Sequence, residues 1–343
     1  MQRIVVDRPG GYKRLRLEEH PGRGPGPGEV RIEVVGAGVN FADVAVRLGL
    51  YESAKRYVGW PITPGFEVAG RVVEVGDGVD EPRVGDEVCA VTLFGGYVSE
   101  LVVPAEQVFP LPAGYALADA AGFPTVFLTA WYALHRSLAV ERGHTLLVHS
   151  AAGGVGGALL QLGKIAGARC VGVVGSSAKV AAARALGADV VIDKSSADLW
   201  EAARAAAPDG YDGVLDANGV ETLRRSYKSL APEGRLVVYG FHTMFRRGGE
   251  RASLPRLALG WLRTPRFDPI SMTNQNRSVM AFNLSFLFHR KEVLRRAMQE
   301  LLGWATEGRL QALRTESVPL AEAGEAHRRL QSGETVGKLV LAP

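Results

Sequence analysis

This sequence of 343 residues contains few cysteines and histidines, and its net charge is small. Its 2 cysteines, Cys89 and Cys170, cannot build a disulfide framework or a four-thiolate zinc site. The 7 histidines show no metal-binding spacing such as HExxH, and His149 is most simply interpreted as a packed or capping residue. Lysine and arginine exceed aspartate and glutamate by 40 − 36, or +4, which argues against a nucleic-acid partner. A reducing cytoplasm is the expected compartment.

The sequence also lacks an uninterrupted hydrophobic run. Its longest uncharged stretch, residues 143–163, contains a cluster of glycines and two histidines, so a strand, a glycine turn and a helix explain it better than a membrane span. The opening QRIVVDRPG does not resemble a secretory signal. There is no GxSxG motif to support hydrolysis. We therefore expect no integral membrane segment and no hydrolase.

The order of the sequence patterns predicts two domains, as the length suggests at roughly 150 residues per domain. The first third alternates short β-branched runs such as VRIEVVGAGV and EVAGRVVEVG with turn residues, which predicts antiparallel strands. From about residue 120, apolar runs alternate with alanine-rich helical segments. This second pattern is typical of a doubly wound parallel sheet, so the fold class is α/β.

The strongest local signal is VHSAAGGVGGALLQLGKIAGA, residues 148–168, in which a strand leads into a glycine turn and then a helix. Gly153, Gly154 and Gly156 would let the backbone approach a pyrophosphate at the helix N-terminus. The bare motif is equally compatible with tight packing alone. Its position between a buried strand and a helix, with a further strand-helix unit after it, favours dinucleotide binding.

The end of the next strand, CVGVV, bears on which nicotinamide cofactor is preferred. Enzymes selective for NAD usually carry an acidic residue there, whereas this chain continues Gly175-Ser176-Ser177-Ala178-Lys179. Hydroxyl groups and a lysine suit the 2′-phosphate of NADPH, although Lys179 could also be an ordinary solvated residue. The pattern predicts NADPH as the cofactor.

Five ordered motifs resemble the medium-chain dehydrogenase/reductase family, in its zinc-independent quinone oxidoreductase branch. They are GVNFADVAVRLGLY (38–51), PGFEVAGRVVEVGDGV (64–79), VGDEV (84–88), AAGGVG (151–156) and the closing VGKLVLAP. The late segment SMTNQNRSVMAFNLSFLF looks like the homologues of a synaptic-vesicle membrane protein.

The resemblance implies the domain organisation. It implies a GroES-like substrate domain in residues 1–120, a Rossmann NADPH-binding domain in residues 121–285, and a C-terminal segment, residues 286–343, that completes the catalytic domain. It also implies that SVMAFNLSF lies at a sheet edge and pairs with its twin in a homodimer.

No metal is expected. Zinc enzymes of the family place a cysteine and a histidine ligand at positions that resemble Asn40 and Phe66 here, and neither residue can replace those ligands. The structural zinc lobe would need four cysteines after the GDEV motif, where this chain has one.

The resemblance implies three catalytic candidates: Asn40, Asp43 and Tyr51. Asn40 could donate its amide to a substrate carbonyl, and Asp43 could order the same loop. Tyr51 could orient the substrate or donate a proton, or it could be only an aromatic wall. The chain departs from the quinone reductases at Asn283, where they have arginine, and at Ala45, where some have tyrosine. Because of these two departures, the resemblance does not specify which substrate the chain binds.

On the cofactor side, the glycine motifs and the resemblance together imply contacts to NADPH. The candidate residues are Thr129, Ser150, Gly153, Gly154, Val155, Gly175, Ser176, Lys179, Lys194, Gly240, Phe241 and Lys338.

The expected function is NADPH-dependent, zinc-independent reduction of the C=C bond of an α,β-unsaturated carbonyl compound, by hydride transfer to the β-carbon. The small-molecule substrate would be an enoyl thioester such as an enoyl-CoA, or a quinone or enone. The alternative is an NADPH-binding homologue without turnover, used structurally or at a vesicle membrane.

A segment rich in arginine, residues 245–267, follows the last Rossmann motif. It contains Arg246, Arg247, Arg251, Arg256, Arg263 and Arg266, interleaved with Leu254, Leu257, Leu259, Trp261 and Leu262. The simplest interpretation is a helix whose leucines pack while its arginines stay in water. The alternatives are a platform for the phosphates of a coenzyme A thioester and a contact with anionic lipid.

Overall fold

Alternate burial along the N-terminal strands builds the first of two sheets in the computed structural model, which describes residues 1–245 and 252–343. In β3 (Glu29–Val39), Val30, Ile32 and Val34 are buried whereas Glu33 and Val35 are exposed, as the two-residue period of a strand requires. The sheet has the order β14-β15-β3-β4-β5-β7, with β6 beside β3. Its other strands are β4 (Glu67–Val75), β5 (Glu87–Val91), β6 (Glu100–Pro104), β7 (Val108–Pro110), β14 (Thr315–Pro319) and β15 (Lys338–Ala342).

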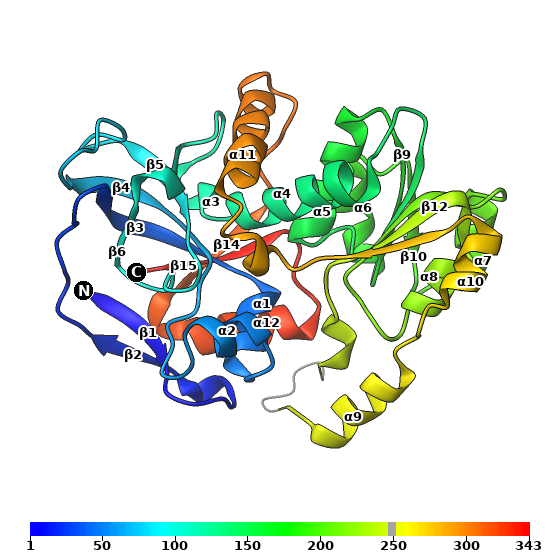
Figure 1. Ribbon diagram of the computed structural model, residues 1–343, viewed down its shortest axis with the longest axis horizontal. Coiled ribbons are helices and arrows are strands. Elements are labelled where there is room, and N and C mark those ends of the chain that lie inside the picture. The colour runs from blue at the N-terminus through cyan, green and yellow to red at the C-terminus, as the bar shows by residue number, and fades with distance from the viewer. Residues whose placement is uncertain (246–251) are drawn as a thin grey trace.

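Both ends of the chain belong to this half of the molecule (Figure 1). The N-terminal β1 (Gln2–Val6) and β2 (Leu15–Glu19) form a separate antiparallel pair. The C-terminal β15 runs antiparallel to β3, so the last strand lies inside the sheet that the first third of the chain begins. Helices α1 (Phe41–Arg47), α2 (Glu52–Tyr57) and α12 (Ala323–Ser332) lie beside it.

Near-continuous apolar strands build the second sheet, which has six parallel strands in the order β10-β9-β8-β11-β12-β13. This is the order of a doubly wound dinucleotide-binding sheet, and it confirms the predicted α/β architecture of a GroES-like and a Rossmann domain. The strands are β8 (Thr145–Val148), β9 (Arg169–Val174), β10 (Val190–Asp193), β11 (Tyr211–Asp216), β12 (Leu230–Val238) and β13 (Ser278–Ala281).

Helices cover both faces of the parallel sheet and bury its side chains in two separate cores. One core includes residues of α4 (Pro124–Trp131), α5 (Gly154–Ile165), α6 (Val180–Ala185) and α11 (Lys291–Thr306). The other includes residues of α7 (Leu199–Ala206) and α8 (Leu223–Lys228). The short α3 (Leu117–Ala120) leads from the first sheet to α4, which packs against α5 near the centre of the molecule (Figure 1).

The two sheets meet where the glycine-rich turn touches the C-terminal strand. The amide of Gly337 donates to the carbonyl oxygen of Ala152 at 2.9 Å, and Gly337 forms a parallel bridge with Gly153. Because the turn precedes α5 and Gly337 precedes β15, the predicted cofactor site adjoins the predicted substrate domain.

β13 lies at the edge of the parallel sheet, where the sequence placed the SVMAFNLSF segment. Only Ser278–Ala281 form a strand there. Asn283 then opens a short 3₁₀ helix, Leu284–Leu287. The strand is preceded by α9 (Leu254–Arg263) and α10 (Pro269–Gln275), and α9 stands away from both sheets (Figure 1).

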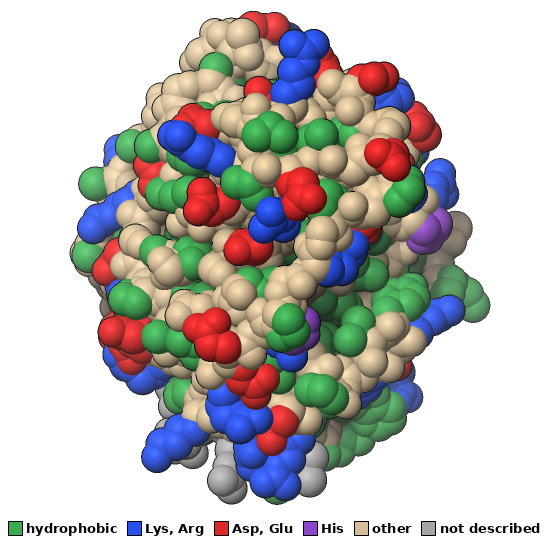
Figure 2. Space-filling view, turned by 90° about the vertical axis from the view of Figure 1, so that its left-hand side faces the viewer, with side chains coloured by type: hydrophobic (Ala, Val, Ile, Leu, Met, Phe, Trp, Pro, Cys, Tyr) green, Lys and Arg blue, Asp and Glu red, His purple; other side chains and the backbone are tan. Residues whose placement is uncertain are grey.

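Basic and acidic side chains are interspersed over most of the face in Figure 2, with a basic group at its lower end.

Within the described residues, every helix is too short or too polar to cross a bilayer.

Candidate active site

The glycine-rich turn joins β8 to α5 and has a backbone that only small residues allow. Ser150 has a positive φ of 55°, and Gly153 is the N-cap of α5. A Cβ added at Gly156 would lie 2.2 Å from the carbonyl oxygen of Ser150, so glycine is required there. The first amides of a helix have no intrahelical acceptor and carry the positive end of its dipole. These residues fit a dinucleotide pyrophosphate.

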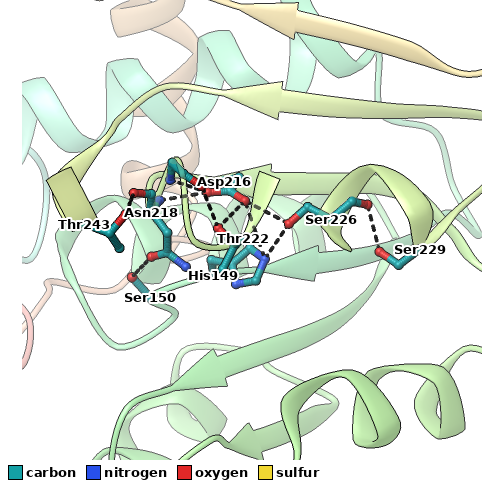
Figure 3. A network of polar contacts seen from close by, with 9 residues as sticks. His149, Ser150, Asp216, Asn218, Thr222, Ser226, Ser229 and Thr243 are labelled. Carbon is teal, nitrogen blue, oxygen red and sulfur yellow. Dashed lines mark hydrogen bonds and ion pairs between the residues drawn. The ribbon is translucent and has the colours of Figure 1, made fainter. Parts of the chain in front are cut away.

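A buried carboxylate, Asp216, holds the loop that follows β11 (Figure 3). Its Oδ1 accepts hydrogen bonds from the amides of Asn218 and Gly219 at 2.8 and 3.0 Å. Its Oδ2 accepts hydrogen bonds from the hydroxyls of Thr222 and Ser226 at 2.7 and 2.8 Å. Four hydrogen bonds satisfy both carboxylate oxygens, so Asp216 holds this loop in one conformation.

His149 is fully buried under the same network (Figure 3). Its Nε2 lies 3.0 Å from Ser226 Oγ, and because that hydroxyl donates to Asp216, Nε2 carries the hydrogen and donates. Nδ1 is then unprotonated, and it has no partner among the described residues. Burial lowers the pKa of His149. His149 is therefore a neutral packed residue, as the sequence predicts.

The loop after β11 is tied to the glycine-rich turn and to the segment after β12. Ser150 Oγ donates to Asn218 Oδ1 at 3.2 Å, and Thr243 Oγ1 donates to the carbonyl oxygen of Asn218 at 2.7 Å. The carboxyl ends of three neighbouring strands thus converge, where open α/β sheets bind their ligands. Sequence reasoning missed Asp216 and Asn218, although the polar residues of DAN at the end of an apolar strand were a usable signal.

At the end of β9, the predicted 2′-phosphate residues lie beside an unforeseen carboxylate. Ser177 Oγ donates to Asp193 Oδ2 at 2.6 Å, and hydrogen bonds from Ser177 and Ser195 lower the pKa of Asp193 to about 2. Lys194 passes next to Gly175, where an added Cβ would lie 3.9 Å from its Cε. Lys179 Nζ donates to two backbone carbonyl oxygens of residues 333–335, at 2.6 and 2.8 Å.

Asn40, at the position that resembles a zinc ligand of the family, belongs to a buried ionic cluster with Glu67 and Lys338. Asn40 Nδ2 donates to Glu67 Oε1 at 2.8 Å. Lys338 Nζ donates to Glu67 Oε1 at 2.8 Å, to Asn40 Oδ1 at 2.5 Å and to the carbonyl oxygen of Val39 at 3.0 Å. Glu67 Oε2 accepts the amide of Thr125 at 2.7 Å.

The cluster has two consequences for the predicted roles. The three hydrogens of the Lys338 ammonium group all have acceptors within the chain, and its contact to the cofactor stays a prediction. Glu67 is fully buried and was missed by sequence reasoning, although a charged residue at the start of the apolar run EVAGRVV was its signal.

Asp43 joins the start of α1 to the turn before β4. Its Oδ2 accepts the amide of Asn40 and its Oδ1 accepts the amide of Gly65, each at 2.8 Å. Burial raises the pKa of Asp43 to about 7, against these hydrogen bonds and the nearby charge of Lys338. Its geometry orders the loop that holds Asn40.

Tyr51 lies in an aromatic group at the start of α2. Its ring centroid is 5.8 Å from that of Phe66 and 6.4 Å from that of Phe94, and Phe66 and Phe94 are 5.0 Å apart. Its hydroxyl donates to Asn283 Oδ1, 2.9 Å away in the segment after β13. Burial raises the pKa of Tyr51. Two positions that the sequence singled out separately, Tyr51 and Asn283, are thus in direct contact.

The residues expected near the nicotinamide lie on α4 and after β12. Thr129 Oγ1 donates to the carbonyl oxygen of Thr125 at 2.7 Å, one turn earlier on α4. Gly240 and Phe241 follow β12, and the side chain of Phe241 is 41% exposed. Beyond them, the rings of His242 and Phe245 approach that of Phe41 at 5.6 and 5.3 Å. The segment after β12 therefore reaches the first turn of α1 in the other domain.

The simplest interpretation of the arginine-rich segment holds only in part for the described residues: Arg256, Arg263 and Arg266 are exposed as expected and Leu257 is half-buried, but the other apolar side chains do not pack. On α9, Leu259, Trp261 and Leu262 are 51%, 65% and 71% exposed, because the helix stands away from both sheets. Arg266 lies 5.8 Å from the ring centroid of Trp261. Arg246, Arg247 and Arg251 lie outside the described residues, as does the side chain of Leu254.

No group of three or more His, Cys, Asp or Glu side chains in the described part of the chain could hold a metal ion. Both cysteines are buried, and burial raises the pKa of each thiol to about 12.

Two protein-family models match the chain. The alcohol dehydrogenase GroES-like domain matches residues 26–113, and the zinc-binding dehydrogenase family matches residues 186–341. The matched ranges correspond to most of the antiparallel sheet and to the second half of the chain.

Individual relatives match along the whole chain. The synaptic vesicle membrane protein VAT-1 homolog of Rattus norvegicus is 33% identical over 99% of this chain and 83% of its own length. A 2-haloacrylate reductase of Burkholderia sp is 31% identical over 99% of this chain and 98% of its own length. The structure of Escherichia coli quinone oxidoreductase complexed with NADPH has a TM-score of 0.85 and 28% identity, with 100% of both chains covered.

Proposed function

This chain belongs to the medium-chain dehydrogenase/reductase family, in the quinone oxidoreductase branch with the VAT-1 homologues, and from that premise we propose that it reduces activated C=C bonds. It is an oxidoreductase, and NADPH is its cofactor. The proposed substrates are α,β-unsaturated carbonyl compounds.

The proposed cofactor site runs along the carboxyl ends of the parallel strands. The amides of Gly154 and Val155 would bind the pyrophosphate, next to Ser150. The amide of Gly153 donates to the carbonyl oxygen of Ser150 at 2.9 Å, so Gly153 would contribute by letting the backbone approach the cofactor. Lys194 and the Ser176 hydroxyl, beside Gly175, would bind the 2′-phosphate together with Lys179. Thr129 and the Gly240–Phe241 turn would lie against the nicotinamide. Lys338 would contact the cofactor from the start of β15, where the two sheets meet.

The observation that supports an α,β-unsaturated carbonyl substrate is the aromatic group Tyr51, Phe66 and Phe94. Next to it in the sequence begins the cluster of Glu67, Lys338 and Asn40, whose charges balance each other. Phe66 occupies the position that resembles a zinc ligand in relatives, and it packs against the other two rings. Planar conjugated molecules bind well against aromatic faces and edges. The ammonium of Lys338 is paired with Glu67, so the nearby site is close to neutral. A flat, uncharged enone or quinone head group suits these surroundings.

When bound, NADPH would supply a hydride to the β-carbon of the substrate. The π electrons of the C=C bond then move toward the carbonyl oxygen, and the resulting enolate takes a proton from water at its α-carbon. The chain must therefore hold the carbonyl group, stabilise the charge that develops on its oxygen and exclude bulk water. A side-chain donor at the aromatic group would meet the first two needs.

The finer substrate choice lies between an enoyl thioester and a quinone or enone. The exposed α9, with Arg256, Arg263 and Arg266, would suit the phosphates of a coenzyme A thioester. Equal specificity constants for an acyl-CoA and a free enone would count against that role.

We also propose a homodimer through β13. The outer edge of this strand has no neighbour in the described chain, and Met280 on it is 41% exposed. An unpaired apolar edge is an aggregation hazard that pairing with a second copy removes. Light scattering at micromolar concentration should give twice the 36.7 kDa chain mass, and a monomer would contradict the proposal.

Absorbance at 340 nm tests the reaction with a quinone, cyclohexenone, and straight and branched enoyl-CoA thioesters, each with NADPH and NADH. Selective consumption of NADPH with an enone or enoyl thioester is the expected result. Tight NADPH binding in a fluorescence titration without turnover of any of them would instead favour the non-catalytic alternative. The expected cytoplasmic location remains a prediction.

A further inference from the structure

The side-chain amide of Asn283 connects the edge of the parallel sheet to the aromatic group. Its Oδ1 accepts hydrogen bonds from the Tyr51 hydroxyl at 2.9 Å and from the Ser285 amide at 3.0 Å. The hydroxyl of Ser285 lies 2.8 Å from the same oxygen and 2.8 Å from Ser53 Oγ. Three hydrogen-bonding groups thus surround one amide oxygen.

These contacts fix which way the amide faces. A backbone amide can only donate, so the atom of Asn283 that meets Ser285 must be the oxygen and not the nitrogen. The Tyr51 hydroxyl meets the same oxygen, so it must donate its hydrogen there. Tyr51 therefore has no hydrogen to offer a substrate unless this bond breaks.

The other candidate donors around the site are also engaged. Asn40 Nδ2 donates to Glu67 Oε1, with the carbonyl oxygen of Gly38 at 3.4 Å. The Thr129 hydroxyl donates to a carbonyl oxygen of its own helix, and the Lys338 ammonium group has three acceptors.

The amide nitrogen of Asn283 differs from these groups. The amide oxygen takes all three of the contacts described above, and the nitrogen has no acceptor among the described residues. Asn283 is half-buried, and its nitrogen is not among the fully buried polar atoms that lack a partner, so the nitrogen keeps some contact with solvent. Within the described chain it is thus a donor without a partner, on an amide that three contacts hold next to Tyr51.

We infer that Asn283 Nδ2 donates a hydrogen bond to the carbonyl oxygen of the substrate, and that Tyr51 is a positioning residue that holds the Asn283 amide. This inference rests on the proposed reduction of a conjugated carbonyl. As hydride reaches the β-carbon, negative charge grows on the carbonyl oxygen, and the bond from Nδ2 strengthens. The proton that completes the reaction comes from water, and not from Tyr51.

The test compares Asn283→Asp with Tyr51→Phe. The aspartate keeps an oxygen for Tyr51 and for the Ser285 amide, and it is an equally good N-cap, but it has no amide hydrogens. Loss of one donor to a developing oxyanion lowers kcat by about 10²–10³-fold, which we expect for Asn283→Asp with cyclohexenone. Tyr51→Phe leaves the amide held by Ser285, and we expect a loss of less than about tenfold with an unchanged pH profile of kcat.

Two further variants serve as a matched control and as a substitute for Asn283→Asp. Asn276→Asp makes the same chemical change at the exposed end of α10 and should behave as the unmodified chain. If Asn283→Asp does not fold, Asn283→Ser keeps an oxygen acceptor at the N-cap while removing the amide. It is expected to lose as much activity as the aspartate variant.

Binding of cyclohexanone to the NADPH-loaded protein separates this inference from the proposed reaction, because the saturated ketone cannot be reduced at a C=C bond. Asn283→Asp should weaken its Kd about tenfold, even if no member of the substrate panel is turned over. The inference is overturned if Asn283→Asp changes kcat/KM and the cyclohexanone Kd less than threefold. It is also overturned if Tyr51→Phe loses as much activity as Asn283→Asp, since Tyr51 would then act directly.

Discussion

Replacing Lys338 with methionine should destabilise the chain strongly, because it leaves a buried carboxylate without its counter-charge. Glu67 is fully buried and Lys338 is 4% exposed, with their charged atoms 2.8 Å apart. Breaking a buried pair from one side costs about 3–5 kcal/mol, since the remaining charge keeps its desolvation penalty. The double substitution Lys338→Met with Glu67→Gln removes both charges, and its free energy of unfolding should recover about half of that loss.

Urea unfolding followed by tryptophan fluorescence measures these differences. Lys164 pairs with Asp189 at the same distance of 2.8 Å but is 48% exposed, so Lys164→Met is the matched control. Exposed pairs contribute about 0–1 kcal/mol, and the control should stay within that range. A loss below about 1 kcal/mol for Lys338→Met, or a double variant less stable than the single one, would refute the reasoning.

Two further predictions concern carboxylates elsewhere in the site. Burial raises the pKa of Asp43 from 3.8 to about 7, so the folded state binds more protons between these values, and the free energy of unfolding should fall as the pH rises through them and level off above. Asp43→Asn should flatten this part of a plot of urea midpoint against pH, and an unchanged slope would contradict the assignment. Asp193 accepts from Ser177 beside the proposed 2′-phosphate site, so Asp193→Asn should tighten NADPH binding several-fold at low salt and leave NADH binding unchanged in fluorescence titrations.

The sequence was sufficient for the architecture because periodicity and glycine positions are local signals. The apolar runs from residue 120 onward gave the parallel sheet, and the turn at 151–156 lies between β8 and α5 as predicted. The packing of α9 could not be predicted in this way. Its apolar residues could form a buried helix face, but burial depends on what lies opposite each of them. The 3₁₀ helix His242–Met244 contacts one side of α9, and Leu259, Trp261 and Leu262 stay exposed.

The limits of sequence reasoning are clearest at the hydrogen bonds of the site. The resemblance points to Asn40, Tyr51 and Lys338 as functional positions, and each of these side chains carries a hydrogen-bond donor. Their donors are engaged by Glu67, Asn283 and the carbonyl oxygen of Val39, each of which lies far from its donor in the sequence.

A side chain whose hydrogen-bond donors are all paired within the protein can position its neighbours but has no donor left for a ligand. A side chain that is held in place and keeps an unpaired donor can bind a ligand. By this criterion Asn283, which the sequence marked only as a departure from the quinone reductases, is better placed to bind substrate than the tyrosine it contacts. The distinction depends on which atom of an amide faces a backbone N–H group, and only the three-dimensional arrangement contains that information.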